Sequence, residues 1–357
     1  MSYVASKGGA AAIDQAHRLV AHALQRQEQE TASIESALRQ QSRAVDRIMA
    51  EAALYAPYLA AKALLQAQGD IPEAVFLLRA HRVTLPQLAT ALPVARSQNR
   101  PLRRISAVFK DLPGGQRLGA TYDYSHRLFG YFADQEAPKA GDALGETSSP
   151  AHTSPADFLL REGLLEESSC NDEPDVLPDL TREPLQFPAG RALRLQSLAR
   201  ADEGFLLGLA YSTQRGYGHN HPFLGELRQG LTPIYLQLPE LEAPIVIGEI
   251  HLTECQSLHQ SAATNSCLTR GYGLQLGDNE RKAISMALVD RALRAAELSE
   301  SIDAPAQDQE FVLNHGDNVA AMGFVEHLKI PHHVDFQSEL QILREGRQRE
   351  GGTDCAD

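Results

Sequence analysis

Residues 279–297, with the sequence NERKAISMALVDRALRAAE, are the stretch that decides the fold of this chain. Apolar residues recur in it every three or four positions, which is the spacing of one face of an α-helix. Asp278 or Asn279 is the expected N-cap. The apolar side chains occupy two adjacent rows, namely Met286, Val289 and Leu293, and Ile284, Leu288 and Ala292. The stretch therefore predicts a helix with one face buried against another layer of structure.

Two apolar runs upstream of this helix predict strands. Residues 234–238 and 245–252 are rich in isoleucine, leucine and valine, as strands commonly are. In the second run, Glu249 and His251 share a face, and they fit either ion pairing or acid–base chemistry. A third run, residues 205–211, fits a strand or a buried helix equally well. The second half of the chain is thus expected to be α+β.

The first part of the chain is predicted to be helical. Apolar residues recur at helical spacing through residues 8–92, with Pro57 and Gly69 as interruptions. Asp70 is a candidate N-cap and Pro72 stands in the first turn of the helix that follows. The predicted class is α+β, with a helical N-terminal region followed by a mixed sheet and helix C-terminal region.

Shifts in composition divide the chain into five predicted regions. They are a helical N-terminal domain (1–98), a basic loop region rich in glycine and arginine (99–133), an acidic insert rich in proline and serine (134–188), an α+β domain with the site motifs (189–343) and a flexible tail (344–357). Within the insert, residues 158–160 are expected to dock as one helical turn.

Composition excludes several classes of protein. The chain has 357 residues and a net charge of -13, which argues against general binding to nucleic acid or to anionic membranes. Its four cysteines form no Cys-x-x-Cys pair, which argues against an iron–sulfur cluster or a structural zinc site built from this chain alone. No signal peptide or membrane span is visible, so a cytoplasmic protein is expected.

A histidine-rich segment, residues 323–336, is a candidate metal site. On an ideal helix His327 and His332 would point roughly 140° apart, too far to share one ion. Pro331 interrupts the helix, and a turn there can bring the two rings together. The alternative is a surface turn that happens to contain histidines.

A basic segment around Pro113-Gly114-Gly115 is a candidate phosphate site. Arginine matches phosphate oxygens, and glycine lets backbone N–H groups approach an anion. The segment lacks the Gly-Lys-Ser/Thr ending of a Walker A loop, and a solvated basic loop is the alternative. Its basic residues near the glycines are Arg103, Arg104, Lys110 and Arg117.

The sequence Arg-Gly-Tyr-Gly occurs twice, beginning at Arg215 and at Arg270. Two such bends suit a clamp on a ligand, with aromatic rings available for stacking on a base. The alternative is a pair of tight turns that need glycine. His221 follows the first copy in a dense polar loop, where a role in substrate contact is open.

Several long motifs together resemble the PhnI family, a subunit of the bacterial carbon–phosphorus lyase core complex. The similarity extends over nearly the whole chain and weakens in 134–188 and beyond about 344. It is carried by DEGFLL (202–207), AYSTQRGYG (210–218), NHPF (220–223), TRGYGL (269–274) and ERK (280–282), and by residues 104–108, 110–111, 113–116, 121–124, 327–329 and 331–332.

The resemblance implies a reaction on a nucleoside triphosphate. With its partners, such a subunit replaces the nucleobase of ATP or GTP by methylphosphonate, giving ribose 1-methylphosphonate 5-triphosphate. Alone it resembles a nucleosidase that releases ribose 5-triphosphate. The implied partners are subunits of the PhnG, PhnH, PhnJ, PhnK and PhnL types and a second copy of the chain in a core dimer. Cleavage of the carbon–phosphorus bond belongs to the PhnJ partner.

The resemblance and the chemistry of the reaction together suggest roles for residues. Departure of the base leaves positive charge on the ribose, so Asp202 or Glu203 is expected to supply a carboxylate and His221 a proton. The triphosphate, bound with Mg²⁺, needs fixed cations, for which the candidates are Arg104, Lys110, Arg117, Arg215 and Arg270.

The resemblance also implies that His327 and His332 hold a zinc ion shared with the PhnJ-type partner. The choice of carboxylate, the preference for ATP or GTP, the role of the insert and the remaining zinc ligands stay open. The alternatives are a scaffold subunit that forms the core dimer and part of a zinc site, and, less favoured, a free-standing zinc hydrolase.

Overall fold

The computed structural model describes residues 9–29, 33–123, 127–129, 153–167, 178–217, 221–260 and 267–351. The chain divides into two compact units, residues 32–318 and residues 1–31 together with 319–357. The larger unit combines helices with an antiparallel sheet of four strands, which confirms the predicted α+β class. The boundaries of the five regions predicted from the sequence stay predictions.

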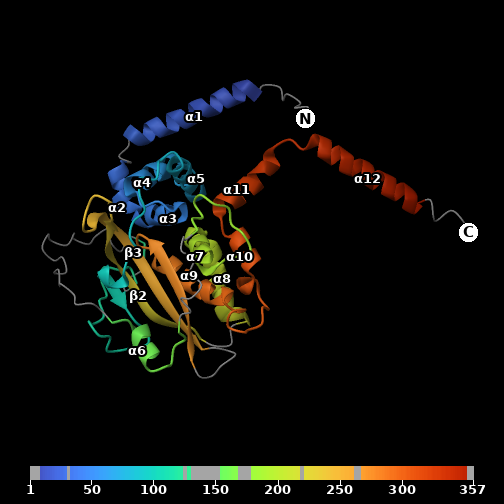
Figure 1. The fold of residues 1–357 in the computed structure, drawn as a ribbon. Helices are drawn as coiled ribbons and strands as arrows, with labels where there is room; N and C mark the ends of the chain where they lie inside the picture. Colours follow the sequence, from blue (N-terminus) through green and yellow to red (C-terminus); the bar gives the residue numbers. More distant parts are fainter. Residues whose placement is uncertain are drawn as a thin grey trace, which may run out of the picture. The chain divides into compact units, whose positions relative to one another are not determined.

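Four short helices form the first part of the larger unit and gather at one end of the sheet (Figure 1). They are α2 (Ile34–Gln40), α3 (Ser42–Ala52), α4 (Pro57–Gln66) and α5 (Ile71–Arg82). The Asp70 side chain accepts a hydrogen bond from the backbone N–H of Glu73 at 3.0 Å, and Pro72 lies in the first turn of α5. This cap is the one that the sequence predicts.

The sheet has the order β1–β2–β3–β4, and all three pairings are antiparallel. Both predicted strands exist, but β2 begins already at Phe223, eleven residues before the predicted strand 234–238. The strands are β1 (Arg100–Ile105), β2 (Phe223–Leu236), β3 (Ile245–Gln260) and β4 (Leu268–Leu276).

Helix α9 (Glu280–Leu293) packs directly on β3 and β4. Gly271 and Gly273 of β4 make this possible, because a Cβ on either would lie 2.0 Å from a backbone oxygen of α9. In the second Arg-Gly-Tyr-Gly motif, the glycines therefore serve close packing of helix on strand. The predicted helix 279–297 is confirmed, although α9 ends at Leu293.

The main core lies between α9 and helices that pack beside it, among them α7 (Arg191–Arg200), α8 (Glu203–Ser212) and α10 (Gln309–His315). The apolar run 205–211 is thus a buried helix rather than a strand. It contributes Leu206, which is fully buried, to the same core as Met286 and Val289 of α9. The predicted apolar face of 279–297 is therefore confirmed as well.

The insert contributes one helix to the described residues, α6 (Pro155–Arg161). Leu159 and Leu160 pack against a small cluster that contains Leu258 of β3, as the sequence predicts. Short helical turns complete the larger unit, namely η1 (Arg96–Gln98), η3 (Thr213–Tyr217, a π-helical turn) and η4 (Pro305–Gln307).

The smaller unit is helical in its described residues except for the turn at 330–332. It contains α1 (Gly9–Gln29), most of α11 (Asn318–Glu326), η5 (His327–Lys329) and α12 (His333–Gly351). Helix α12 continues well past residue 344, so residues 344–351 are helical where the sequence predicted a flexible tail.

Within the described residues, no single helix has the length and apolar character needed to cross a membrane; α3 and α4, bent by 102° at their junction, pass that test only as a pair.

Candidate functional site

Asp202 and Glu203 stand at the start of α8, where each carboxylate has a defined cationic partner. Asp202 is the N-cap of α8 and accepts a hydrogen bond from the backbone N–H of Phe205 at 2.7 Å. Its other oxygen accepts from Nη2 of Arg47 at 2.5 Å. Glu203 accepts from Nε of Arg281. Capping and ion pairing together hold both carboxylates in place.

A third carboxylate, Glu51 of α3, joins these two residues in the interior. Its side chain is fully buried and accepts from Nε of Arg47 at 2.7 Å and from Nδ2 of Asn318 at 2.6 Å. It also accepts from the backbone N–H of Glu203 at 3.2 Å. Glu51 therefore links α3, α8 and the start of α11 through one carboxylate.

Lys282 adds a buried cation beside these carboxylates. Its side chain is fully buried and donates to the backbone oxygen of Ala199 at 2.7 Å. Burial lowers the pKa of Lys282 to about 8, against the attraction of Glu51. We call Arg47, Glu51, Asp202, Glu203, Arg281 and Lys282 the Asp202 cluster. It balances three carboxylates against three cations, and its Arg281 end reaches solvent.

A second acidic pair, Asp46 and Asp278, joins α3 to the segment just before α9. Oδ2 of Asp46 accepts from the backbone N–H of Asp278 at 3.1 Å. Burial, and in addition the charge of Asp278, raises the pKa of Asp46 to about 6, although that hydrogen bond opposes the rise. A carboxyl group that titrates near neutral pH is suited to donate or accept a proton. Asp46 precedes Arg47 on the same helix.

His251 of β3 approaches this acidic pair from the sheet. Burial lowers its pKa, and the charge of Asp278 opposes that shift. Its Nε2 atom is buried and has no hydrogen-bond partner among the described residues. Neither His251 nor Asp46 was among the predicted catalytic residues. For His251, the sequence indicated only that it shares a strand face with Glu249, which fits ion pairing or acid–base chemistry. No motif or pattern in the sequence around Asp46 indicated a role for it.

The structure does not bring His221 to the Asp202 cluster. Asp202 and Glu203 begin α8, whose ten residues extend about 15 Å, and His221 follows beyond its other end. His221 precedes β2 at the end where Phe223 pairs with Leu258, whereas Arg281 follows the opposite end of β4. The exposed ring of His221 lies 5.6 Å, centre to centre, from the ring of Phe223.

Arg104, a predicted phosphate ligand, is a buried residue of β1. Its Nε donates to Glu226 at 2.5 Å, and its two terminal nitrogens donate to the backbone oxygens of Pro113 and Thr153. Arg96 and Arg228 also bind Glu226, and they hold its pKa below the ordinary value although burial acts to raise it. Arg104 thus holds the basic loop and the insert against the sheet.

The other predicted phosphate ligands are spread over the larger unit. Lys110 and Arg215 are exposed, and Arg117 is half-buried with Nη1 donating to Pro101 at 2.9 Å. Arg270 is half-buried on β4, where burial lowers its pKa and Glu166 opposes that shift. His219, which adjoins the first Arg-Gly-Tyr-Gly motif, lies outside the described residues.

The turn at Pro331 brings His327 and His332 together, as the sequence predicts. Their ring centres are 5.4 Å apart and the rings are nearly perpendicular. Nδ1 of His327 contacts the backbone oxygen of Phe324, which leaves Nε2 directed elsewhere. Two imidazoles that share a tetrahedral zinc ion have ring centres roughly 5 Å apart, so the pair fits two positions of such a site.

Residues 2–350 match the model of a family described as "Bacterial phosphonate metabolism protein (PhnI)". The chain belongs to the PhnI family. The resemblance inferred from its motifs is confirmed, and it extends across the insert.

Two relatives support this assignment for the PhnI chain, and both are named "Alpha-D-ribose 1-methylphosphonate 5-triphosphate synthase subunit PhnI". The protein from Rhizobium meliloti (strain 1021) is 53% identical over 350 residues, which cover 97% of this chain and 95% of the relative. The protein from Escherichia coli (strain K12) is 48% identical over 358 residues, covering 98% and 99% respectively. Identity at this level over full length implies the same fold.

Proposed function

We propose that this chain is the subunit of a synthase that replaces the nucleobase of ATP or GTP by methylphosphonate, giving ribose 1-methylphosphonate 5-triphosphate. The observation that carries the proposal is the 53% and 48% identity, over nearly full length, to two proteins named as subunits of that synthase. Alone, the chain would act as a nucleosidase, with water in place of the phosphonate. Its nucleotide substrate is cytoplasmic, and so we expect the protein there.

The Asp202 cluster suits the charge that develops in this reaction. The bond between C1 of the ribose and the purine nitrogen breaks, and a phosphonate oxygen forms a new bond to C1. The base gains the proton that the phosphonate loses. Between these events C1 carries positive charge, which the carboxylates of Asp202 and Glu203 can stabilise. Glu51 and Arg47 fix their positions from the interior.

We propose Asp46 rather than His221 as the group that delivers the proton to the base. Its pKa of about 6 keeps part of the population protonated near neutral pH, and it adjoins Arg47 of the Asp202 cluster. His221 lies beyond the other end of α8. The exposed side chains of Lys110 and Arg215 remain candidates to bind the Mg²⁺-bound triphosphate.

The zinc ion enters the proposal as a shared site. His327 and His332 would hold it through one ring nitrogen each, and a PhnJ-type partner would complete the ligands. Among the described residues, no group of three or more histidine, cysteine, aspartate or glutamate side chains is arranged to hold a metal. Zinc supplies a Lewis acid, or a link between subunits, when bound.

The test of the proposal is an assay of the purified chain with ATP and Mg²⁺. Chromatography measures free adenine and phosphorus NMR measures the intact triphosphate. We expect adenine release with the triphosphate retained, a fall of at least tenfold for Glu203→Gln and Asp46→Asn, and no change for the control Glu310→Gln on the exposed surface of α10. Equal rates for Glu203→Gln and the parent would remove the Asp202 cluster from the chemistry.

A scaffold role is the second candidate, and one observation favours it. The region around the histidine pair exposes large apolar side chains, including Phe324 at 77%, Leu328 at 69% and Phe336 at 61%. Such exposure is typical of surfaces that other subunits cover. Under this alternative the chain alone releases no adenine, and Glu203→Gln has no effect after partner subunits are added.

A further inference from the structure

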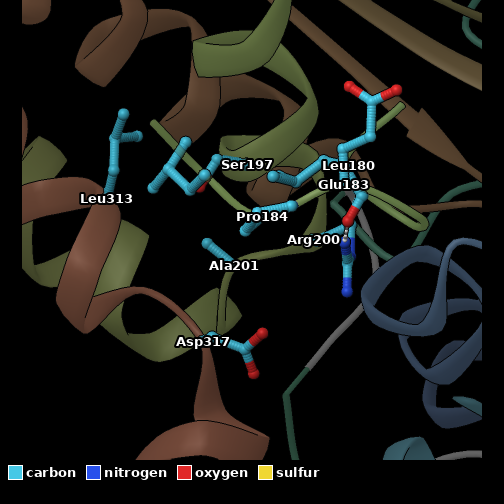
Figure 2. A pocket seen from close by; sticks show the side chains of 9 residues that line it. Leu180, Glu183, Pro184, Ser197, Arg200, Ala201, Leu313 and Asp317 are labelled. Carbon is cyan, nitrogen blue, oxygen red and sulfur yellow. Dashed lines mark hydrogen bonds between the residues drawn. The ribbon is translucent and has the colours of Figure 1, made fainter. Parts of the chain in front are cut away.

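A cavity of about 220 Å³ lies apart from the Asp202 cluster, between α7, residues 180–185 and the segment that joins α10 to α11 (Figure 2). Leu180, Leu185 and Leu313 form an apolar wall, while Arg200 and Asp317 supply charge. A water molecule occupies roughly 30 Å³ in the liquid, so the cavity has room for a small organic molecule. We call it the Arg200 pocket.

Arg200 lines this pocket with a buried nitrogen that lacks a partner. Nη1 of Arg200 donates to the backbone oxygen of Leu180 at 2.6 Å, but its Nε is buried and has no hydrogen-bond partner among the described residues. Arg82 of α5 does not line the pocket, but its charge acts on Arg200, and its Nη1 likewise has no partner among the described residues. A buried charged donor without an acceptor is costly, and native proteins rarely keep one without a reason.

Three arginines, Arg79, Arg82 and Arg200, outnumber the two carboxylates that attract Arg200, which are Asp317 and Asp179. Burial, followed by repulsion from Arg79, lowers the pKa of Arg200 to about 10. The pKa of Arg82 is lowered by burial and then by the same neighbour. Asp317 is engaged by Arg79, which donates to its two oxygens at 2.7 and 2.8 Å. In Figure 2 the carboxylate of Glu183 points away from Arg200 and Asp317.

We propose that the Arg200 pocket is a second binding site, for a small oxyanion of the phosphate and phosphonate class. A tetrahedral oxyanion offers an acceptor to the partnerless Nε of Arg200 and balances the excess positive charge of the neighbouring arginines. The apolar wall formed by Leu180, Leu185 and Leu313 leaves room for a short alkyl group beside the anion. The site goes beyond the proposed reaction, because none of these residues belongs to the Asp202 cluster.

The pocket is nevertheless linked physically to that cluster. Nη1 of Arg79 holds Asp317 in the pocket wall, while its Nε and Nη2 donate to the backbone oxygen of Glu51 at 3.1 and 2.7 Å. Asn318, the next residue after Asp317, donates to the carboxylate of Glu51. An anion beside Arg200 therefore acts on residues in direct contact with the carboxylate that joins the cluster.

Isothermal titration calorimetry of the full chain tests the proposal, with inorganic phosphate, methylphosphonate and acetate as separate probes. We expect phosphate or methylphosphonate to bind and acetate to bind at least tenfold more weakly. Arg200→Gln should weaken binding at least tenfold. Ser197→Phe, which fills the pocket from α7 and leaves every arginine in place, should do the same. The matched control is Arg39→Gln on the exposed face of α2, which should bind as the parent does.

The outcomes separate the two sources of the ligand and the two sites. Tighter binding of methylphosphonate assigns the pocket to organic phosphonates, and equal or tighter binding of phosphate assigns it to the free ion. The proposal is overturned if folded Ser197→Phe binds the anions as the parent does. It is also overturned if neither anion binds at about 10 mM, a concentration at which even weak binding is measurable. Glu203→Gln should bind the anions as the parent does, even if it no longer releases adenine. The binding measurement therefore tests the Arg200 pocket independently of the proposed reaction.

Discussion

Replacing Glu51 by glutamine should destabilise the protein strongly, because it removes the charge at the centre of the Asp202 cluster. The carboxylate is fully buried and accepts hydrogen bonds from Arg47, Asn318 and the backbone N–H of Glu203. Glutamine keeps the shape but turns one acceptor into a donor that faces other donors. Breaking a buried ion pair in this way costs about 3–5 kcal/mol of unfolding free energy. We expect a loss in that range at pH 7.

The pH dependence of this loss is a sharper test, because it isolates Lys282. The folded-state pKa of Lys282, about 8, lies below the 10.5 of a free lysine. The unfolded chain therefore binds more protons between pH 8 and 10.5, and stability rises with pH across that window. Without the charge of Glu51 the folded pKa falls further, so the window extends below pH 8 in Glu51→Gln. The loss should be larger at pH 7 than at pH 9 by about 1 kcal/mol.

Urea unfolding followed by far-ultraviolet circular dichroism at both pH values measures these quantities. The chain contains no tryptophan, so its ten tyrosines supply the second, fluorescence signal. Glu310→Gln on α10 is the control, and as an exposed carboxylate it should change stability by less than about 0.5 kcal/mol. A Glu51→Gln loss as small as this control, or one of equal size at pH 7 and pH 9, would refute the coupling between Glu51 and Lys282.

Three further predictions concern the sheet. Gly273→Ala places a Cβ 2.0 Å from the backbone oxygen of Ala283, so α9 must shift, and the free energy of unfolding should fall by about 3 kcal/mol. The control is Gly248→Ala, which has open space around it and should lower the free energy of unfolding by less than about 1 kcal/mol in the same urea titration. Burial lowers the pKa of His259 from 6.5 to about 3, so the unfolded chain binds a proton below pH 6.5 that the folded chain does not bind. Between pH 7 and pH 5, the free energy of unfolding of His259→Gln should therefore fall by about 2 kcal/mol less than that of the parent. Equal falls in the two proteins would contradict this. Glu226→Gln leaves three arginines around a neutral side chain and should cost about 3–5 kcal/mol or prevent folding, as soluble yield and thermal melting will show.

Local features of the fold were predictable because they depend on neighbours in the sequence. The cap formed by Asp70, the helix 279–297 and the strands within 234–252 follow from side-chain periodicity and from capping chemistry, which act over a few residues. The turn at Pro331 belongs to this group, since proline interrupts a helix wherever it stands, and it brings His327 and His332 together.

The candidate site was predictable only in part. Asp202 and Glu203 were chosen from their motif, but their partners Arg47 and Glu51 lie about 150 residues earlier in the chain and carry no motif of their own. His221 is close to Asp202 in the sequence, yet a ten-residue helix separates them in space. Sequence distance and spatial distance differ here because α8 separates its own two ends, whereas Arg47 and Glu51 of α3 bind its first residues.

The basic residues show the same division. An arginine beside glycines is equally typical of a phosphate loop and of a buried structural ion pair, since both need a planar donor. Only the packing of β1 against β2 shows that the guanidinium of Arg104 donates to Glu226 and to two backbone oxygens.

The sequence by itself determined the α+β class, the helical N-terminal region, helix α9, parts of β2 and β3 and the PhnI family, because local periodicity or contiguous motifs specify each of them. Tertiary structure alone decided that Glu51 joins Asp202 and Glu203, that burial raises the pKa of Asp46 to about 6 and that Arg200 lines a cavity. The physical reason is that burial and charge pairing depend on which distant segments meet, and packing of the whole chain sets those meetings.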